Sequence, residues 1–212
     1  MRMVRSEFLV EVEKRIRQAN SLLITDEVLT GFGRCGSLFA YQRAGLKPDI
    51  ISLSKGLTGG FLPMGVTMSS KKISDGFLGD DPKQTFWHGH SFTANPLGCA
   101  AANASLDLLE KSPQKYIDFE LRHLPHLQKI IKHSKVECPR ITGTIAAFNI
   151  KVNGNKGYLS SVGKHMKASA LKVGVFIRPL GDVIYLMPPL CITDEELEKC
   201  YYGIQKGLNL LD

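Results

Sequence analysis

Two side chains with complementary chemistry directly follow two short apolar runs. Residues 21–25 lead into Asp26 and Glu27, and residues 49–54 lead into Lys55. Short apolar runs of this kind, bounded by glycine and proline, are typical of inner strands in a covered, mostly parallel sheet. Ligands of such sheets bind just beyond the carboxyl ends of the strands. The sequence therefore predicts an acid and an amine at the edge of the sheet where a cofactor would bind.

The pair Asp26 and Lys55 has a specific chemical use. A buried lysine can attack a carbonyl carbon, and a buried carboxylate can hold a protonated ring nitrogen. Pyridoxal phosphate chemistry requires these two groups. Each residue also has a simpler interpretation, because an aspartate at a strand end often caps the next helix and most lysines are solvated surface charges. The neighbouring sequence favours the cofactor site.

The sequence pattern of one enzyme family recurs in five stretches: residues 26–34, 47–49, 54–60, 87–96 and 98–104. Together they resemble the class III aminotransferases, a fold-type-I family that uses pyridoxal phosphate. The resemblance covers nearly the whole chain and implies an α/β fold. The implied fold has two parts. The first is the C-terminal part of a large cofactor-binding domain, with a mostly parallel sheet and helices, and the second is a small C-terminal α+β domain. A shift in composition near residues 111–113 predicts the boundary, which gives domains of residues 1–111 and 112–212.

One subfamily is favoured by two stretches, residues 88–103 and 174–189. They resemble the adenosylmethionine–8-amino-7-oxononanoate aminotransferases of the biotin pathway. The resemblance implies that an amine passes from S-adenosylmethionine to 8-amino-7-oxononanoate and yields 7,8-diaminononanoate, in a homodimer. A cytoplasmic location is expected from the absence of targeting signals in the sequence. Omega-amino acid transaminases of the same family carry similar sequence around Arg178. That activity stays open as an alternative, and so does a catalytically inactive fragment that only folds or associates.

The resemblance implies roles for residues of the first domain. Lys55 corresponds to the catalytic lysine that bonds to the cofactor and contacts the substrate. Asp26 corresponds to the carboxylate that pairs with the ring nitrogen of the cofactor. Val28 corresponds to a residue that packs against the ring, and its side chain should share a face with Asp26 if the strand continues.

Further residues match positions that the family uses for the substrate and the phosphate group. Gly89 matches a substrate contact, and His90 and Ser91 match contacts to the cofactor phosphate, in a turn that typically reaches into the neighbouring subunit. The family usually has threonine in place of Ser91, and serine keeps the hydroxyl. Arg178 matches the arginine that receives the substrate carboxylate, a role that suits its planar guanidinium fork. Tyr185 is expected near the same pocket.

The resemblance begins in the middle of the family's large domain. In members of that family, the N-terminal half of the chain normally supplies the loop that binds the cofactor phosphate and the aromatic ring that stacks on the cofactor. A split or truncated gene product that works with a complementary N-terminal fragment would account for this, and so would a degraded remnant of a gene. We also expect exposed apolar surface where the absent strands would pair.

The composition is that of an ordinary globular protein, with 43% hydrophobic and 22% charged residues among 212. No apolar run approaches the ~20 residues of a membrane span, and no hydrophobic region of a signal peptide follows the start. The formal net charge of +7 is spread along the chain, which argues against nucleic-acid binding. Five scattered cysteines indicate a reducing compartment, and His88 and His90 lack a third ligand for a metal site.

Hydrophobic periodicity predicts most of the remaining elements. Helices are expected over residues 6–19, 96–110, 116–132 and 162–173 and after residue 193. Strands are expected over residues 61–68, 141–152, 175–177 and 183–186. Asn95 and Pro96 should open the second helix, and Pro125 should interrupt the third. Gly174 should end the fourth, and Thr193 with Glu196 should form a capping box for the last.

Overall fold

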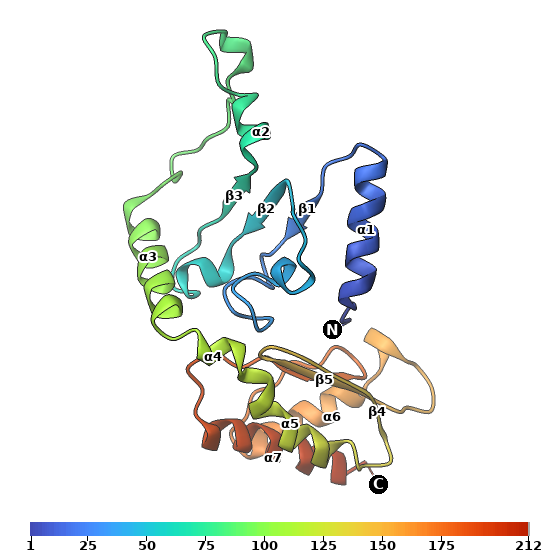
Figure 1. Ribbon diagram of the computed structural model, residues 1–212. Helices are drawn as coiled ribbons and strands as arrows, with labels where there is room; N and C mark the ends of the chain where they lie inside the picture. Colours follow the sequence, from blue (N-terminus) through green and yellow to red (C-terminus); the bar gives the residue numbers. More distant parts are fainter. Residues whose placement is uncertain (212) are drawn as a thin grey trace. The chain divides into compact units, whose positions relative to one another are not determined.

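The computed structural model describes residues 1–211, which fall into two compact units. The first unit is Val4–Pro113, and the second combines Met1–Met3 with the chain from Gln114 onward. Each unit contains a three-stranded sheet (Figure 1). None of the helices formed by residues 1–211 is long and apolar enough to cross a membrane.

The sheet of the first unit has the strand order β1-β2-β3. β1 (Ile24–Asp26) runs parallel to β2 (Ile50–Leu53), as predicted, whereas β3 (Val66–Ser69) runs antiparallel to β2. The expected parallel arrangement therefore holds for one of the two strand pairs. The link from β2 to β3 holds only the 3-10 helix η2 (Lys55–Thr58) and turns, without the crossover helix that brings a strand back in the parallel direction.

The helices of the first unit are α1, α2 and α3, and two further 3-10 helices accompany them. Their bounds are Ser6–Gln18 for α1, Lys71–Asp75 for α2, Pro96–Lys111 for α3, Ala40–Ala44 for η1 and Pro82–Gln84 for η3. α1 and α3 confirm two predicted helices. Asn95 caps α3, because its side-chain oxygen accepts a 2.7 Å hydrogen bond from the backbone N–H of Gly98. Pro96 occupies the first helical position, where a missing N–H costs nothing.

The apolar strands of the first unit are buried on one side only. Leu23 and Leu53 are 7% and 5% exposed, but Leu22 and Ile24 are 54% and 59% exposed. The expectation that both strands lie inside a covered sheet is therefore wrong for β1, which is an edge strand of this sheet. The exposed side chains agree instead with the expectation of uncovered apolar surface, since edge strands with apolar faces normally pair with further chain.

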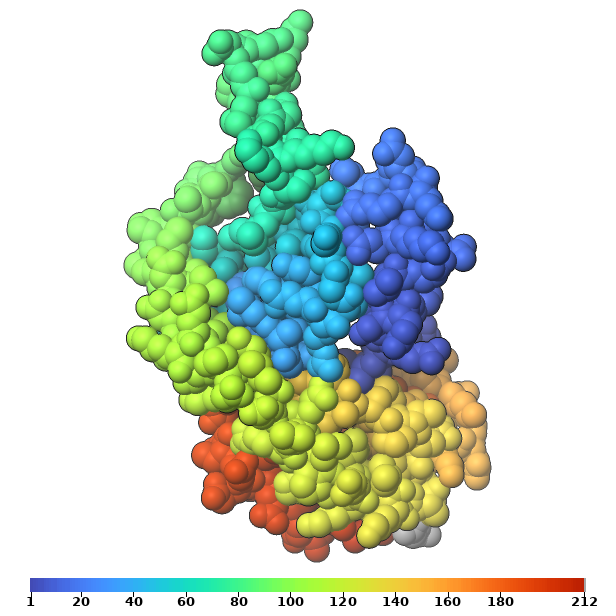
Figure 2. All heavy atoms as spheres, viewed as in Figure 1, coloured from blue at the N-terminus to red at the C-terminus, as the bar shows by residue number. Residues whose placement is uncertain are grey.

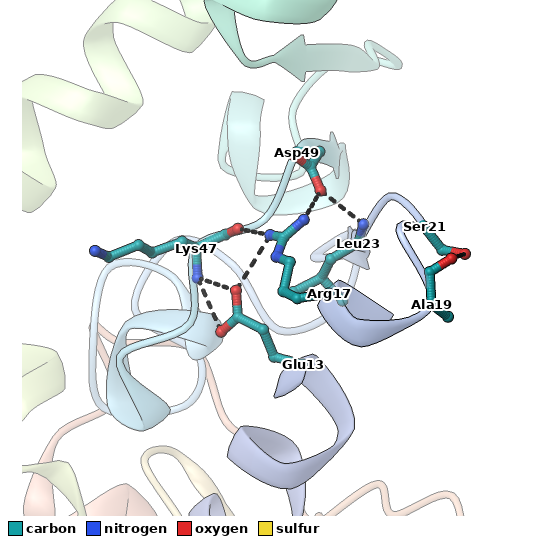
Figure 3. A network of polar contacts seen from close by, with 7 residues as sticks. All are labelled: Glu13, Arg17, Ala19, Ser21, Leu23, Lys47 and Asp49. Atoms are coloured by element: carbon teal, nitrogen blue, oxygen red, sulfur yellow. Dashed lines mark hydrogen bonds and ion pairs between the residues drawn. The ribbon is translucent and has the colours of Figure 1, made fainter. Parts of the chain in front are cut away.

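A polar network joins the end of α1 to the starts of β1 and β2 (Figure 3). The guanidinium of Arg17 donates to the carboxylate of Asp49, to Glu13 and to the backbone oxygen of Lys47. Asp49 also accepts a 2.8 Å hydrogen bond from the N–H of Leu23. This N–H and the Arg17 guanidinium hold the pKa of the Asp49 carboxyl below its ordinary value. The network fixes α1 against the amino ends of the two parallel strands, so Asp49 has a structural task.

The second unit is an antiparallel sheet with the strand order β4-β5-β6, packed with helices. Its elements are α4 (Gln114–Ile117), α5 (Phe119–Ile130), β4 (Val136–Thr142), β5 (Ile145–Ile150), η4 (Gly157–Leu159), α6 (Val162–Lys172), β6 (Val183–Leu186) and α7 (Asp194–Asn209). The core of the unit gathers Phe148 and Ile184 from the sheet with Met166 from α6 and Ile204 from α7. This is the α+β layout predicted for the C-terminal part of the chain.

Several expectations for the second unit are confirmed. α6 ends before Gly174, whose φ of +76° lies in the left-handed region that glycine adopts without strain. Thr193 accepts from the N–H of Glu196 at 3.2 Å, and the Glu196 side chain accepts from the N–H of Thr193 at 2.9 Å. Both bonds of the predicted capping box are therefore present.

Three expectations for the second unit are wrong. The strand predicted over 141–152 is a hairpin, in which β4 and β5 flank a turn at Gly143 and Thr144. Residues 175–177 form no strand, and the bridge to β6 from the segment before it is the isolated antiparallel pair of Leu180 and Val183. Pro125 lies inside α5, and the helix break falls at Asp118. The ring is tolerated because Pro125 lies on the exposed face of α5, where water can hydrate the carbonyl that loses its N–H partner.

A buried histidine that the sequence did not single out lies at the centre of the second unit. His123 is fully buried on α5, with its Nε2 at 3.0 Å from the backbone oxygen of Thr144 and its Nδ1 at 2.7 Å from the hydroxyl of Tyr201. Because a carbonyl oxygen only accepts, Nε2 carries the proton and Nδ1 accepts from Tyr201. Burial lowers the pKa of His123 to about 4. In its neutral form, the imidazole of His123 therefore connects α5 by hydrogen bonds to the β4–β5 hairpin and to α7.

Acidification should destabilise the second unit through His123. In the unfolded chain the imidazole takes up a proton below its ordinary pKa of 6.5, whereas in the folded state it stays neutral down to about 4. The unfolded state thus binds more protons in this window, and stability falls as the pH drops from about 6.5 to about 4, by roughly 3 kcal/mol over the whole window. Burial lowers the pKa of His126 as well, which acts in the same direction.

Urea unfolding at several pH values measures this loss. His123→Gln should lower stability at pH 7 but remove most of the extra loss between about pH 6.5 and pH 4. His165→Gln, the same change at an exposed histidine of the second unit, controls for the loss of an imidazole. Equal pH dependence in the wild type and in His123→Gln would contradict the assignment.

Candidate active site

The carboxyl ends of β1 and β2 bring the predicted acid and amine to one edge of the sheet. Asp26, the last residue of β1, pairs in register with Ser52 of β2, and Lys55 follows β2 as the first residue of η2. Parallel pairing is what places both groups at the same edge. Asp26 and Lys55 are both exposed. The described residues therefore bring the two groups to one edge but do not bury them, which corrects the expectation of a buried pair.

The backbone at Lys55 is held in an uncommon conformation. Its φ of +44° lies in the left-handed region, which costs a residue with a side chain on the order of 1 kcal/mol and is often kept at functional sites. Backbone hydrogen bonds secure the turn on both sides, from Leu57 to Ser54 at 3.0 Å and from Gly60 to Lys55 at 3.1 Å. The amine of Lys55 makes no hydrogen bond or ion pair with any residue of the described chain. It is available to a ligand.

The glycine after Lys55 allows a close approach of two segments. A Cβ atom added to Gly56 would lie 2.9 Å from the Cβ of Phe32, closer than side chains approach one another. Phe32 packs in the small core of the first unit with Leu53 and Leu57. The hydroxyl of Ser105 on α3 donates to the backbone oxygen of Gly56 at 3.1 Å. The turn that carries Lys55 is thus fixed from the loop after β1 and from α3.

The two neighbouring acids Asp26 and Glu27 have different surroundings. Asp26 is exposed, and its Oδ1 accepts a 3.0 Å hydrogen bond from the N–H of Val28. Glu27 is 2% exposed, and its carboxylate accepts hydrogen bonds from Thr30, Ala40 and Tyr41. Of the two acids, Asp26 is therefore the one that a ligand can reach.

Val28 does not lie on a continued strand. β1 ends at Asp26, and the chain enters a turn at Val28, which is half-buried. Val28 was expected to share a face with Asp26 only if the strand continued, and the strand ends before Val28. The direct link between the two residues is the hydrogen bond from the Val28 N–H to the Asp26 carboxylate.

The predicted turn at Gly89, His90 and Ser91 belongs to an exposed segment of the first unit. Every residue from 74 to 94 is exposed, and Figure 2 shows the chain around α2 as a narrow projection. The N–H of Thr93 donates to the backbone oxygen of His90 at 3.0 Å, which closes the turn. His90 lines a cavity of about 470 Å³ together with Met64, Thr67 and the aromatic side chains Phe86 and Phe92. Asp26 and Lys55 do not line this cavity.

The two candidate substrate residues of the second unit lie on a short extended segment and a strand. Val175 and Ile177 are buried and alternate with Phe176 and Arg178, which are exposed, so Arg178 faces outward. Tyr185 is half-buried on β6, where it pairs in register with Ala147 of β5. Arg178 and Tyr185 thus lie in one unit and the pair Asp26 and Lys55 in the other.

Comparison with known proteins identifies the family. The model of the family described as aminotransferase class-III matches residues 1–208 of this chain. The chain belongs to the class-III aminotransferases. The family predicted from the sequence motifs is thereby confirmed.

Two curated relatives carry the same name, adenosylmethionine-8-amino-7-oxononanoate aminotransferase. The relative from Synechococcus elongatus is 52% identical over 204 residues, which cover 96% of this chain and 48% of the relative. The relative from Geobacter sulfurreducens is 40% identical over 215 residues, covering 95% and 46%. This class-III aminotransferase chain therefore spans about half the length of the curated relatives that it matches.

A solved structure agrees with the family assignment. An amine transaminase from an uncultivated Pseudomonas species, crystallised in a PLP-bound form, is 26% identical to this chain. It matches with a TM-score of 0.87 over 98% of this chain and 48% of its own. The α/β fold predicted from the sequence is therefore that of known transaminases.

The sequence motifs of this class-III aminotransferase chain did not reveal the separate task of Glu27. The alternation of side chains along a strand was the available signal, since consecutive residues point to opposite faces and only one member of an acidic pair can face the ligand edge. The burial of Glu27 depends on the loop from Val28 to Tyr41 folding back on β1, and that loop carries no regular periodicity.

Proposed function

We propose that this chain forms part of a pyridoxal phosphate-dependent aminotransferase that transfers an amine from S-adenosylmethionine to 8-amino-7-oxononanoate and yields 7,8-diaminononanoate. The observation that carries the proposal is the pair of exposed groups at one sheet edge, the free amine of Lys55 and the carboxylate of Asp26. The names of relatives at 52% and 40% identity support the substrates.

The residues at this edge fit pyridoxal phosphate in their chemistry. The cofactor, when bound, supplies an aldehyde that an amine can attack and a conjugated ring that accepts an electron pair. The unpartnered amine of Lys55 suits the aldehyde, and Asp26 keeps a carboxylate oxygen free beside the one that accepts from Val28. Asp26 would hold the ring nitrogen in its protonated form, which strengthens the ring as an electron acceptor.

Lys55 has two tasks in the proposed reaction. Its Nζ would hold the cofactor at the sheet edge, and once an amine substrate has displaced it, Nζ would accept the proton from the substrate carbon and deliver it to the cofactor. The turn around Lys55 supports both tasks, because hydrogen bonds at Ser54, Gly56 and Gly60 hold the backbone while the side chain remains free to move.

The two units divide the work in this proposal. We assign the first unit to the C-terminal part of the cofactor-binding domain and the second to the small domain, which carries Arg178 and Tyr185. The exposed segment 74–94 would carry Gly89, His90 and Ser91 to a second copy of the chain in a homodimer. In this segment Phe86, Trp87 and Phe92 are 65%, 80% and 76% exposed. Exposed aromatic side chains that lie close together favour contact with a partner chain.

The complete site would also need a polypeptide that corresponds to the other half of the relatives. The chain spans 48% of the Synechococcus elongatus relative, and Leu22, just before the edge strand β1, and Ile24, within it, are exposed. We propose that this further polypeptide, joined to the chain or separate from it, pairs with the sheet and covers Lys55 and Asp26. Activity is therefore to be measured with the chain alone and with the first half of that relative added.

Replacing Arg178 tests the proposed acceptor. A charged hydrogen bond to a carboxylate contributes on the order of 1.5–3 kcal/mol, so Arg178→Ala should raise the KM for 8-amino-7-oxononanoate by about 10- to 100-fold. Arg178→Lys should recover only part of this loss, because an ammonium group lacks the planar fork. Steady-state kinetics with 8-amino-7-oxononanoate and with its methyl ester, which carries no carboxylate charge, give the measurement.

The ester separates a carboxylate contact from general damage. Arg178→Ala should affect the ester much less than the acid, and Lys172→Ala, a change at an exposed cation of the same unit, should affect neither. An equal loss with acid and ester would refute the carboxylate role of Arg178. Transfer of an amine from omega-amino acids, without turnover of 8-amino-7-oxononanoate, would replace the proposed reaction by that of an omega-amino acid transaminase.

A further inference from the structure

Glu27 is the buried neighbour of the exposed Asp26, and no role follows for it from the proposed chemistry. The residue is 2% exposed, and its carboxylate would be costly to bury without partners. Its Oε2 accepts from the hydroxyl of Thr30 and from the N–H of Ala40 at 3.0 Å, and its Oε1 accepts from the N–H of Tyr41 at 2.8 Å. Each carboxylate oxygen thus faces a backbone donor.

These hydrogen bonds connect three parts of the first unit. Thr30 lies in the turn after β1, and Ala40 and Tyr41 begin η1. The backbone of Glu27 adds two further bonds, because its N–H donates to Ser52 on β2 at 2.9 Å and its oxygen accepts from Gly31 at 3.0 Å. Glu27 is therefore tied to the strand that leads to Lys55 and to the loop that follows Asp26.

The position of Asp26 follows from this arrangement. Asp26 is the last residue of β1, and it is covalently joined to Glu27 and hydrogen-bonded to Val28. A rotation of the backbone at Asp26 that redirected its side chain would displace Glu27 and strain the three hydrogen bonds of the Glu27 carboxylate. We propose that Glu27 is a positioning residue, which holds the Asp26 carboxylate in the direction required for the cofactor ring nitrogen. This inference rests on the proposed function.

The glutamine variant tests this inference sharply, because an amide cannot replace the carboxylate in either orientation. Both oxygens of Glu27 face a backbone N–H, from Ala40 and from Tyr41. In Glu27→Gln the NH2 group must therefore oppose one of these donors, which leaves a buried N–H without a partner. The variant keeps the size of the side chain and changes its hydrogen bonding.

A second variant keeps the carboxylate and removes one donor. Ala40→Pro deletes the N–H that binds Oε2 at the first position of η1, where proline is well tolerated. The preceding residue, Phe39, has φ −128° and ψ 142°, which are values that proline allows in the residue before it. Glu7→Gln on α1, the same chemical change at an exposed glutamate, is the matched control.

The experiment uses the preparation in which the wild-type chain binds pyridoxal phosphate, with thermal unfolding as a check of folding. Borohydride reduction at increasing cofactor concentrations gives the concentration for half-labelling of Lys55, and a pH titration of the bound chromophore gives the midpoint of its spectral change. Glu27→Gln should raise the half-labelling concentration about 10- to 100-fold, as expected for a misplaced contact. It should also move the pH midpoint in the direction in which Asp26→Asn moves it.

The outcomes separate this inference from the proposed function. Ala40→Pro should give intermediate shifts, and Glu7→Gln should behave as the wild type. Folded Glu27→Gln and Ala40→Pro chains with the wild-type midpoint and half-labelling concentration would overturn the positioning role while the proposed function stands. Failure of both variants to fold would assign Glu27 a purely structural role. A wild-type chain that takes no label at Lys55, with or without the first half of its relative, would overturn the proposed function itself.

Discussion

Replacement of Lys55 by alanine is expected to abolish covalent attachment of pyridoxal phosphate and to lower the transamination rate by at least about 10³-fold. Proton transfer by a positioned side chain contributes about 10²- to 10⁴-fold, and the covalent bond to the cofactor is lost in addition. Alanine and lysine share the steric cost of the left-handed backbone at this position, so the change should leave the turn intact. Single-turnover kinetics and mass spectrometry after borohydride reduction measure the two effects.

The control for this experiment is another lysine of the first unit. Lys71 pairs on the surface with Asp75 at 2.7 Å, and Lys71→Ala should leave both labelling and rate at the wild-type level. Addition of methylamine, a small primary amine, should restore part of the rate in Lys55→Ala, because the missing group is then supplied from solution. A Lys55→Ala chain that retains the wild-type rate would show that the amine of Lys55 has no catalytic task.

Replacement of Asp26 by asparagine is expected to lower the rate by about 10²- to 10³-fold while Lys55 still takes the label. A neutral amide cannot stabilise a protonated ring nitrogen, and the loss of one preorganised electrostatic partner typically costs this much. The amide oxygen can still accept the hydrogen bond from Val28, so the local fold should be preserved. The measurement compares kcat with the extent of labelling in the same preparation.

Two observations would bear against the role of Asp26. The first is a wild-type kcat in Asp26→Asn, and the second is an equal loss in Asp75→Asn, in which the same change is made at the surface partner of Lys71. Equal losses would point to general electrostatics and not to a contact with the cofactor. A rate loss in Asp26→Asn alone, with unchanged unfolding temperature, is the expected result.

The sequence predicted the elements that depend on local signals. The apolar spacing and the Asn95-Pro96 start identified α3, and Thr193 with Glu196 identified the start of α7, because caps act within one turn of the helix. The parallel pairing of β1 and β2, with Asp26 and Lys55 at the same edge, also followed from the two apolar runs and their charged ends. These features require little knowledge of the remaining chain.

The features that were missed depend on contacts between distant residues. Residues 175–177 have the alternation of a strand, but they lie outside the three-stranded sheet, and the segment before β6 makes only an isolated bridge from Leu180 to Val183. Pro125 is tolerated in α5 because the opposite face of that helix carries the buried His123 and Leu127. The burial of Glu27 and His123 depends on Tyr41 and Tyr201, and no local pattern indicates such pairs.

The measurement that tests the central claim most directly is the mapping of a reduced cofactor adduct. Pyridoxal phosphate is added to the purified chain, alone and with the first half of the Synechococcus elongatus relative, and borohydride fixes any cofactor bound to an amine. Peptide mass spectrometry then locates the adduct. The proposal predicts a stoichiometric label on Lys55 that disappears in Lys55→Ala. Labelling spread over surface lysines and unchanged in Lys55→Ala, in both preparations, would contradict it.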